Sequence, residues 1–180
     1  MLKYIRVKKE HLKLILGWRR MPHVARNMLS DIENNIEKQG QWFKNIEKDK
    51  SSIYRIISYE NKFIGLVYIT NIDFNNNRCK LGYYIAEIEY IGLGGLFLPP
   101  VYNYIFYKLE LNKIYGEVLD GNSLIISIHK YHGWRAVGTY KKHIIKENKY
   151  YDIHLFELLK DDWLNNNHSK HNSNSMYFEE

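Results

Sequence analysis

The segment from Leu81 to Asn122 constrains the fold of this chain more than any other part of the sequence. It contains an extended apolar stretch, a glycine-rich turn, a helix-length apolar segment and a second strand, at residues 81–85, 92–95, 96–109 and 113–119. Glycines between a strand and a helix let backbone N–H groups approach an anionic ligand, and a helix N-terminus adds partial positive charge. Gly-x-Gly-Gly is also an ordinary turn sequence, so the loop alone leaves an anion site and a plain turn equally open.

The length and composition fit a single compact α/β domain. A chain of 180 residues that is 45% hydrophobic can bury a full core. No apolar run approaches the ~20 residues that cross a bilayer, and the N-terminus lacks the apolar region of a signal peptide. The single cysteine, Cys79, excludes an internal disulfide framework and fits a reducing compartment. We therefore expect a soluble, cytoplasmic protein with one domain over residues 1–162 and a disordered, polar tail over residues 163–180.

The net charge of +6 favours anionic small molecules as ligands. Lysines are spread along the whole chain, and neither a zinc-finger spacing nor a recognition-helix pattern is present. We therefore expect no nucleic acid partner, no membrane partner and no bound metal. The oligomeric state stays open between a monomer and a homodimer.

Hydrophobic periodicity and turn residues predict a mixed sheet with helices on both of its faces. The expected strands cover residues 3–7, 52–59, 62–69, 81–85, 113–119, 137–142 and 150–158, and the expected helices cover 11–18, 30–46, 96–109 and 123–131. The spacing Ser30-x-x-Glu33 is that of a capping box and predicts the start of the second helix. Pro99-Pro100 requires the third helix to begin near Pro99 or to be distorted there, because proline is tolerated only in a first turn.

Two motifs within this frame are specific enough to suggest a family. They are the loop Glu89-x-x-Gly92-x-Gly94 and the segment Asn122-x-x-Ile125-x-x-Ile128-His129-x-x-x-Gly133-Trp134. The first is similar to the Arg/Gln-x-x-Gly-x-Gly/Ala pyrophosphate loop, and the second to the Asn-x-x-Ala-x-x-Leu-Tyr-x-x-x-Gly-Phe segment, of the GNAT family of acetyl-CoA-dependent N-acetyltransferases. The resemblance covers residues 1–160. It implies a GNAT-like α/β (α+β) fold with a mixed, mostly antiparallel central sheet, and acetyl-CoA as cosubstrate.

The N-terminal segment narrows the resemblance. Trp18-Arg19-Arg20-Met21-Pro22, Met28, and two later segments at 69–74 and 81–84 resemble a GNAT subgroup that acetylates nucleotide-linked 4-amino sugars on the route to pseudaminic acid. This implies that the acceptor is a UDP- or dTDP-linked 4-amino-4,6-dideoxy sugar of surface glycan biosynthesis. Related ribosomal-protein acetyltransferases share a similar Trp-Arg start, so a protein N-terminus or an aminoglycoside-like amine stays open as acceptor. A non-catalytic acyl-CoA-binding module with a degenerate site is the third alternative.

The resemblance also implies which residues bind the two substrates. The expected cosubstrate-binding residues are Tyr84, Ile85, Gly92, Leu93, Gly94, Gly95 and Asn122, and the expected acceptor-binding residues are Arg19, Met28, Thr70 and Tyr84. A backbone N–H at Tyr84 or Ile85 would polarise the thioester carbonyl. Arg19 suits an anionic acceptor because a guanidinium binds oxyanions through two parallel hydrogen bonds. Glu89 replaces the family's Arg or Gln, so we expect its carboxylate to point into solvent while the loop backbone binds the pyrophosphate.

Three side chains are candidates for proton transfer. Glu117 matches an acidic position of the subgroup and would accept the proton of the attacking amine. His129 stands where the family has a tyrosine that is thought to protonate the departing thiolate, and an imidazole with an ordinary pKa near 6.5 would also serve. Tyr131 is the reserve acid. A solvated strand-end carboxylate and a helix-surface histidine are the structural alternatives for Glu117 and His129.

Overall fold

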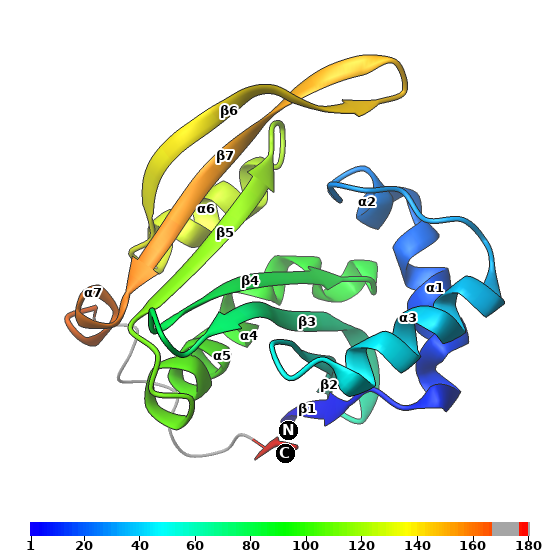
Figure 1. Cartoon of the computed structure of the whole chain (residues 1–180), viewed down its shortest axis with the longest axis horizontal. Helices are drawn as coiled ribbons and strands as arrows, with labels where there is room; N and C mark the ends of the chain where they lie inside the picture. The colour runs from blue at the N-terminus through cyan, green and yellow to red at the C-terminus, as the bar shows by residue number, and fades with distance from the viewer. Residues whose placement is uncertain (167–176, 180) are drawn as a thin grey trace.

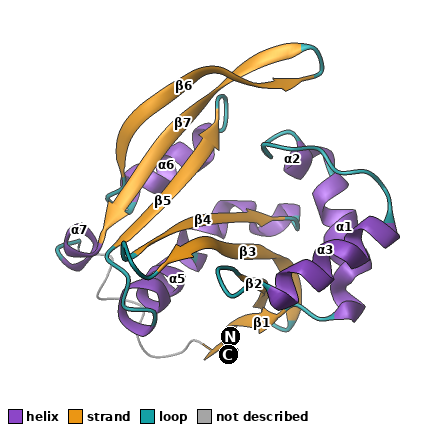
Figure 2. Ribbon diagram, in the orientation of Figure 1, coloured by secondary structure: helices purple, strands orange, loops and turns teal. Residues whose placement is uncertain are grey.

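The computed structural model describes residues 1–166 and 177–179, which form one eight-stranded sheet with helices on both faces (Figures 1 and 2). In spatial order the strands are β6 (Arg135–Lys146), β7 (Lys149–Leu159), β5 (Lys113–Leu119), β4 (Arg78–Ile85), β3 (Lys62–Asp73), β2 (Ile53–Tyr59), β1 (Leu2–Arg6) and β8 (Tyr177–Phe178). Neighbouring strands are antiparallel except for the pairs β4–β5 and β1–β8. The predicted fold class, a mixed and mostly antiparallel sheet with helices on both faces, is therefore confirmed.

The helical segments are short and cover both faces of the sheet. They are η1 (Lys9–His11), α1 (Leu12–Arg20), α2 (Pro22–Ala25), α3 (Ile36–Lys48), η2 (Ile88–Leu93), α4 (Gly94–Phe97), α5 (Pro99–Asn103), η3 (Tyr104–Lys108), α6 (Ser123–Tyr131) and α7 (Lys160–Leu164). The third predicted helix is divided into α4, α5 and η3. Its middle part, α5, begins at Pro99, where a proline in the first turn loses no hydrogen bond. No helix in the described part of the chain is long and apolar enough to cross a membrane.

The start of α3 corrects the predicted capping box. The helix begins at Ile36, because the side-chain oxygen of Asn35 accepts hydrogen bonds from the backbone N–H groups of Glu37 and Lys38, both at 2.9 Å. Asparagine and serine are both good N-cap residues. Placing the start at Ser30 is therefore wrong, and the residues before Asn35 form a loop that is free to line a site.

Adjacent residues of β4 point to opposite faces of the sheet, as the period of a strand requires. Tyr83 packs against the larger apolar core, which includes residues of α4 and α5. Tyr84 belongs to a smaller core on the side of α1. There the buried ring of Trp18 meets Tyr84 edge to face, with ring centroids 6.4 Å apart. The Trp-Arg motif thus anchors α1 on the sheet through its tryptophan.

The parallel strands β4 and β5 are paired only at their start. Three residue pairs connect them: Arg78–Lys113, Cys79–Ile114 and Lys80–Tyr115. Beyond these, β4 stays paired with β3 as far as Ile85, and β5 stays paired with β7 as far as Leu119. The two halves of the sheet therefore diverge (Figure 1). Because backbone N–H and C=O groups need partners, the facing edges of the diverging strands offer hydrogen-bonding groups to a ligand between them.

The C-terminal segment corrects the predicted tail. Trp163 of α7 is fully buried and donates from its indole N–H to Oδ1 of Asn103 at 2.8 Å. Phe178 of β8 stacks on Tyr104 with ring centroids 3.9 Å apart. Because large aromatic rings bury much apolar surface, they order short stretches of an otherwise polar segment. The prediction of disorder is wrong for residues 163–166 and 177–179, and its remaining part, residues 167–176 and 180, lies outside the described residues.

Candidate active site

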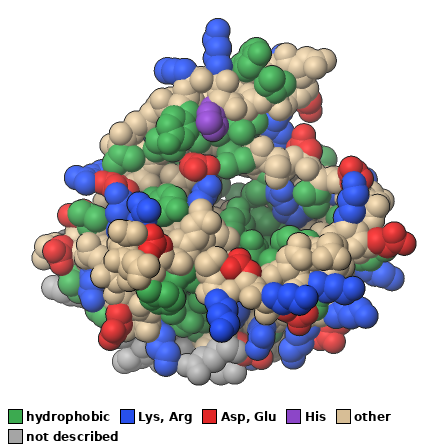
Figure 3. Space-filling model, in the orientation of Figure 1, with side chains coloured by type: hydrophobic (Ala, Val, Ile, Leu, Met, Phe, Trp, Pro, Cys, Tyr) green, Lys and Arg blue, Asp and Glu red, His purple; other side chains and the backbone are tan. Residues whose placement is uncertain are grey.

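A cleft of about 1330 Å³ opens where β4 and β5 diverge (Figure 3). Ligand pockets usually measure ~300–1,000 Å³, so this cleft has room for more than one substrate. One end, the loop end, is lined by Ile91, Gly94, Ile125 and Ile128. The other, the helix end, is lined by residues of α1, α3 and the loop between α2 and α3, including Arg19, Met28 and Trp42.

Most of the predicted site residues meet in this cleft. The predicted residues that line it are Arg19, Met28, Thr70, Tyr84, Ile85, Gly94, Glu117, Asn122 and His129. Gly92, Leu93 and Gly95 do not line it themselves but flank Gly94 in the chain. Tyr131 does not line it either and is 62% exposed on α6. The proposed binding and proton-transfer roles of these residues stay predictions.

At the loop end, nothing in the protein itself requires glycine at Gly92, Gly94 or Gly95. None of the three has a positive φ, and a Cβ atom added to any of them would meet no neighbour closer than 3.7 Å. Close approach of a ligand phosphate to the backbone is a physical reason for glycine at such positions. Glu89 does not line the cleft: its carboxylate, 60% exposed, pairs with Lys62 at 2.6 Å. The carboxylate is thus largely exposed to solvent, as expected, while binding of a pyrophosphate by the loop backbone stays a prediction.

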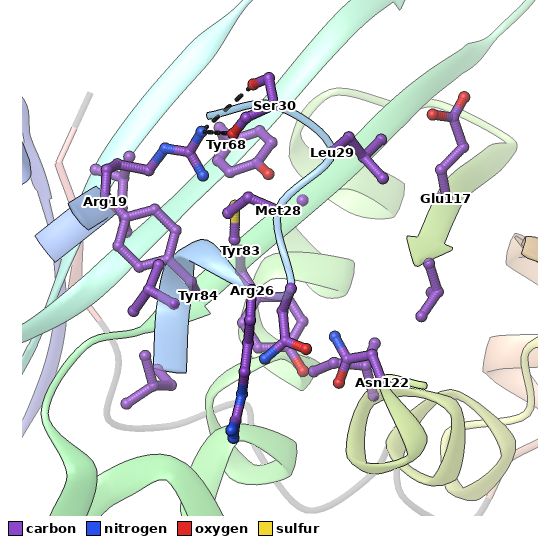
Figure 4. A pocket seen from close by; sticks show the side chains of 18 of the residues that line it. Arg19, Arg26, Met28, Leu29, Ser30, Tyr68, Tyr83, Tyr84, Glu117 and Asn122 are labelled. Atoms are coloured by element: carbon purple, nitrogen blue, oxygen red, sulfur yellow. Dashed lines mark hydrogen bonds between the residues drawn. The ribbon is translucent and has the colours of Figure 1, made fainter. Parts of the chain in front are cut away.

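At the helix end, Arg19 has a guanidinium nitrogen without a partner. Its Nη2 donates to the backbone oxygen of Ser30 at 3.0 Å (Figure 4). Its Nη1 is buried and has no hydrogen-bond partner among the described residues, and the same is true of the Tyr84 hydroxyl. Burial raises the pKa of the Tyr84 phenol far above 10, and the charge of Arg19 only partly opposes this shift, so the hydroxyl keeps its proton. Two donors at this end therefore lack an acceptor, which an oxyanion would supply.

Aromatic rings form one wall of the helix end. The Tyr68 ring stacks on Tyr54 with centroids 5.8 Å apart, and Trp42 meets Tyr54 edge to face at 5.3 Å. Tyr68 lies over Gly82 of the neighbouring strand, where a Cβ atom would come within 2.2 Å of the tyrosine ring. Gly82 therefore provides the space that Tyr68 occupies. Aromatic rings exposed in a cleft pack well against another ring, such as a nucleobase.

The acidic side chains that line the cleft are all paired with basic ones. The pairs are Glu117–Lys80 at 2.8 Å, Glu33–Lys38 at 2.8 Å, Asp31–Lys146 at 3.1 Å and Asp120–His154 at 3.1 Å. By contrast, Arg19 and Arg26 line the cleft without an acidic partner among the described residues. His154 balances Asp120 only when it is protonated, so two unpaired arginines stand against at most one unpaired carboxylate. This excess of positive charge favours an anionic ligand.

His129 is buried in the wall of the cleft. Its ring stacks on Trp134 with centroids 4.4 Å apart and meets Phe156 edge to face at 5.1 Å. Burial, assisted by the nearby His132, lowers the pKa of His129 from 6.5 to about 3. The imidazole is therefore neutral near pH 7 and carries one ring N–H, which can donate a hydrogen bond. An imidazolium acid with an ordinary pKa, as expected from the sequence, does not fit this environment.

Comparison with known proteins identifies the family. Residues 5–155 match the family model described as the acetyltransferase (GNAT) domain. The chain belongs to the GNAT acetyltransferase family. Its structure is similar to that of the spermidine N-acetyltransferase of Vibrio cholerae in complex with CoA and spermine, with a TM-score of 0.84 and 17% identity over 91% of this chain and 98% of that chain. A chimera of the Vibrio cholerae enzyme and hSSAT gives a TM-score of 0.80 at 18% identity, again over 91% and 98% of the two chains.

A relative at the sequence level is YdaF of Bacillus subtilis (strain 168), whose name assigns it provisionally to the ribosomal N-acetyltransferases. The two chains are 25% identical over 116 residues. The match covers 64% of this chain and 63% of YdaF. The sequence identity to the spermidine enzymes is too low to transfer their substrate to this chain. Those structures therefore establish the GNAT fold and leave the acceptor open.

Sequence reasoning missed several residues that line the cleft of this GNAT domain. Tyr68 precedes Thr70 by two positions in β3, so the alternation of a strand could have placed both on the same face. Lys80 could have been found in the same way from Tyr84, which lies four positions further along β4. Arg26 lies in the irregular segment after α2, where no periodic pattern indicates which side chains face the cleft. Lys146 does not line the cleft itself but contacts the backbone oxygen of Met28, a lining residue 118 positions away in the sequence, and no local pattern predicts such a contact.

We predict that Gly82→Ala destabilises the domain by about 1–3 kcal/mol, the usual effect of overpacking, because the new methyl group would overlap the Tyr68 ring. Urea denaturation measures the change. Gly92→Ala is the matched control, since its Cβ would meet nothing within 4 Å. The effect should shrink in a Tyr68→Ala background, and an equal effect in both backgrounds would contradict the proposed packing.

Proposed function

We propose that this chain transfers the acetyl group of acetyl-CoA to the amino group of a nucleotide-linked (UDP or dTDP) 4-amino-4,6-dideoxy sugar. One observation carries the choice of acceptor: at the helix end Nη1 of Arg19 lacks a hydrogen-bond partner among the described residues and lies beside aromatic rings, while three of the four carboxylates of the cleft are paired with lysines. A diphosphate supplies oxygens for the guanidinium, and a nucleobase supplies a ring for the aromatic wall.

The other end of the cleft suits acetyl-CoA. The glycine loop leaves room for a pyrophosphate to approach the backbone. From there the pantetheine arm would run between β4 and β5, where the facing strand edges lack a strand partner. A backbone N–H at Tyr84 or Ile85 would then donate to the thioester oxygen and stabilise the negative charge that develops on it. Asn122, at the start of α6, also lines the cleft and would help to bind the pantetheine arm.

The reaction requires a neutral amine, a polarised thioester and a stabilised leaving thiolate. The amine nitrogen attacks the acetyl carbonyl carbon, the C–S bond breaks, and the nitrogen loses a proton. Glu117, on the far strand of the cleft and paired with Lys80, would accept this proton directly or through water. His129 would act in its neutral form, donating a hydrogen bond to the sulfur, since its pKa of about 3 leaves no imidazolium near neutral pH.

A polyamine acceptor fits this cleft poorly. Spermidine and spermine are polycations, so their binding needs carboxylates that are not already neutralised by the protein. Here three of the four carboxylates that line the cleft pair with lysines, and the fourth, Asp120, contacts His154, which neutralises it only when protonated. A protein N-terminus is the second candidate acceptor, favoured by the similarity to YdaF.

The direct test is the release of free thiol from acetyl-CoA across a panel of acceptors: UDP- and dTDP-linked 4-amino sugars, ribosomal N-terminal peptides, aminoglycosides and spermidine. We expect turnover with at least one nucleotide-linked sugar and little with the rest. Turnover only with peptides or only with spermidine would overturn the proposed acceptor. Binding of acetyl-CoA without turnover of any amine would favour a non-catalytic binding module.

We predict that Arg19→Ala raises the KM for the nucleotide sugar by roughly 10- to 150-fold, which corresponds to the loss of one charge-assisted interaction worth ~1.5–3 kcal/mol. The KM for acetyl-CoA should stay within about twofold, because the hydrogen bonds of Arg19 go to Ser30 and not to the glycine loop. Steady-state kinetics measure both values. Arg20→Ala, exposed and one residue away, is the matched control. An equal rise of both KM values would assign Arg19 a structural role.

We predict that His129→Phe lowers kcat by ~10²-fold, the usual effect of removing one hydrogen-bond donor from a developing anion. Because the pKa of His129 is about 3, its protonation is constant above pH 5, and wild-type kcat should not fall between pH 5.5 and 8.5. A pH–rate profile of both proteins tests this. If kcat instead falls near pH 6–7 in the wild type alone, the imidazolium is the acid. If kcat falls strongly in Tyr131→Phe but not in His129→Phe, the tyrosine is the donor to the leaving sulfur.

A further inference from the structure

Lys146 joins two parts of the chain that are far apart in sequence. It ends β6, next to the turn of the β6–β7 hairpin, and its Nζ donates to the backbone oxygens of Ala25 at 2.7 Å and Met28 at 3.0 Å. The same ammonium pairs with Asp31 at 3.1 Å. Its three partners match the three donors of an ammonium group. The Lys146 side chain is only 11% exposed, which is unusual for lysine and fits a fully bonded ammonium.

The segment that Lys146 holds is part of the helix end of the cleft. Residues 26–33, called here the α2–α3 loop, have no regular secondary structure apart from turns, and all of them line the cleft. The backbone oxygen of Ser30 in this loop accepts the hydrogen bond from Nη2 of Arg19. Lys146 therefore contacts Met28 and Asp31, which lie on either side of Ser30 in the chain. The loop lacks a regular backbone hydrogen-bond ladder, so individual contacts such as those of Lys146 contribute much of what holds its residues after Met28 in place.

We propose that Lys146 is a positioning residue for the acceptor: it fixes the α2–α3 loop against the β6–β7 hairpin and thereby fixes the guanidinium of Arg19. The inference rests on the proposed function, in that Arg19 binds the acceptor. Tyr151 of the same hairpin also lines the cleft, so the hairpin closes this end as well as supporting it. The acceptor would thus be selected by a wall made of the α2–α3 loop and the β6–β7 hairpin, which the ammonium group of Lys146 connects.

The test uses Lys146→Met and measures two quantities. Hydrogen exchange followed by mass spectrometry should show faster exchange of the amides of the α2–α3 loop, by about tenfold, with unchanged exchange in β2 and β3. The KM for the acceptor should rise by about tenfold, while the KM for acetyl-CoA stays within about twofold. Lys146→Arg keeps the charge and several donors, so it should restore part of both effects. Asp31→Asn leaves both bonds to backbone oxygens, so it should have a smaller effect than Lys146→Met.

Lys149→Met is the matched control. Lys149 lies opposite Lys146 across the hairpin turn and is exposed, so its loss removes the same charge without releasing the loop. Unchanged exchange of the loop in Lys146→Met would overturn the inference, as would equal acceptor KM changes in the two methionine variants. The exchange experiment needs no acceptor. If no nucleotide sugar is acetylated, the proposed function is wrong, but the exchange experiment still shows whether Lys146 holds the loop.

Discussion

The short pairing between β4 and β5 determines most of what this molecule can do. Three residue pairs join the strands, and each strand then continues with its other neighbour. The sheet stays continuous at one end and opens at the other. Backbone groups on the open edges have no strand partner and face a cleft of about 1330 Å³. An extended ligand with amide and phosphate groups, such as acetyl-CoA, can satisfy them, and helices on both sides supply the walls.

We propose that electrostatic pairing within the cleft determines which acceptor fits. Each lining carboxylate is held by a basic side chain, and Arg19 is left with a buried, unpartnered nitrogen. The GNAT fold is shared with spermidine acetyltransferases, yet this distribution of charge suits an anion instead of a polycation. The same fold can thus serve different acceptors, because the acceptor end is built from α1, α3 and the loop before α3. Lys146 connects that loop to the rest of the domain.

The fold could be predicted from the sequence, and most of the predicted site residues line the cleft, because strand alternation and motif spacing are local properties. Asn35 caps α3 in place of Ser30, and only the tertiary structure chooses between two suitable caps. The ordered structure around Trp163 was not predicted, because the burial of this one ring outweighs the polar composition of the residues around it. The neutral state of His129 depends on rings that pack around it in space. The contacts of Lys146 span more than a hundred residues, so no local pattern could reveal them.

The most direct test of the central claim is hydrogen exchange of the wild-type protein with and without CoA. If the cofactor lies between the diverging strands, CoA should slow the exchange of amides in the second half of β4 and in the glycine loop, residues 82–86 and 92–96. Exchange in β1, which β3 and β2 separate from β4 in the sheet, should be unchanged. Protection confined to other segments, or no protection at saturating CoA, would contradict the account.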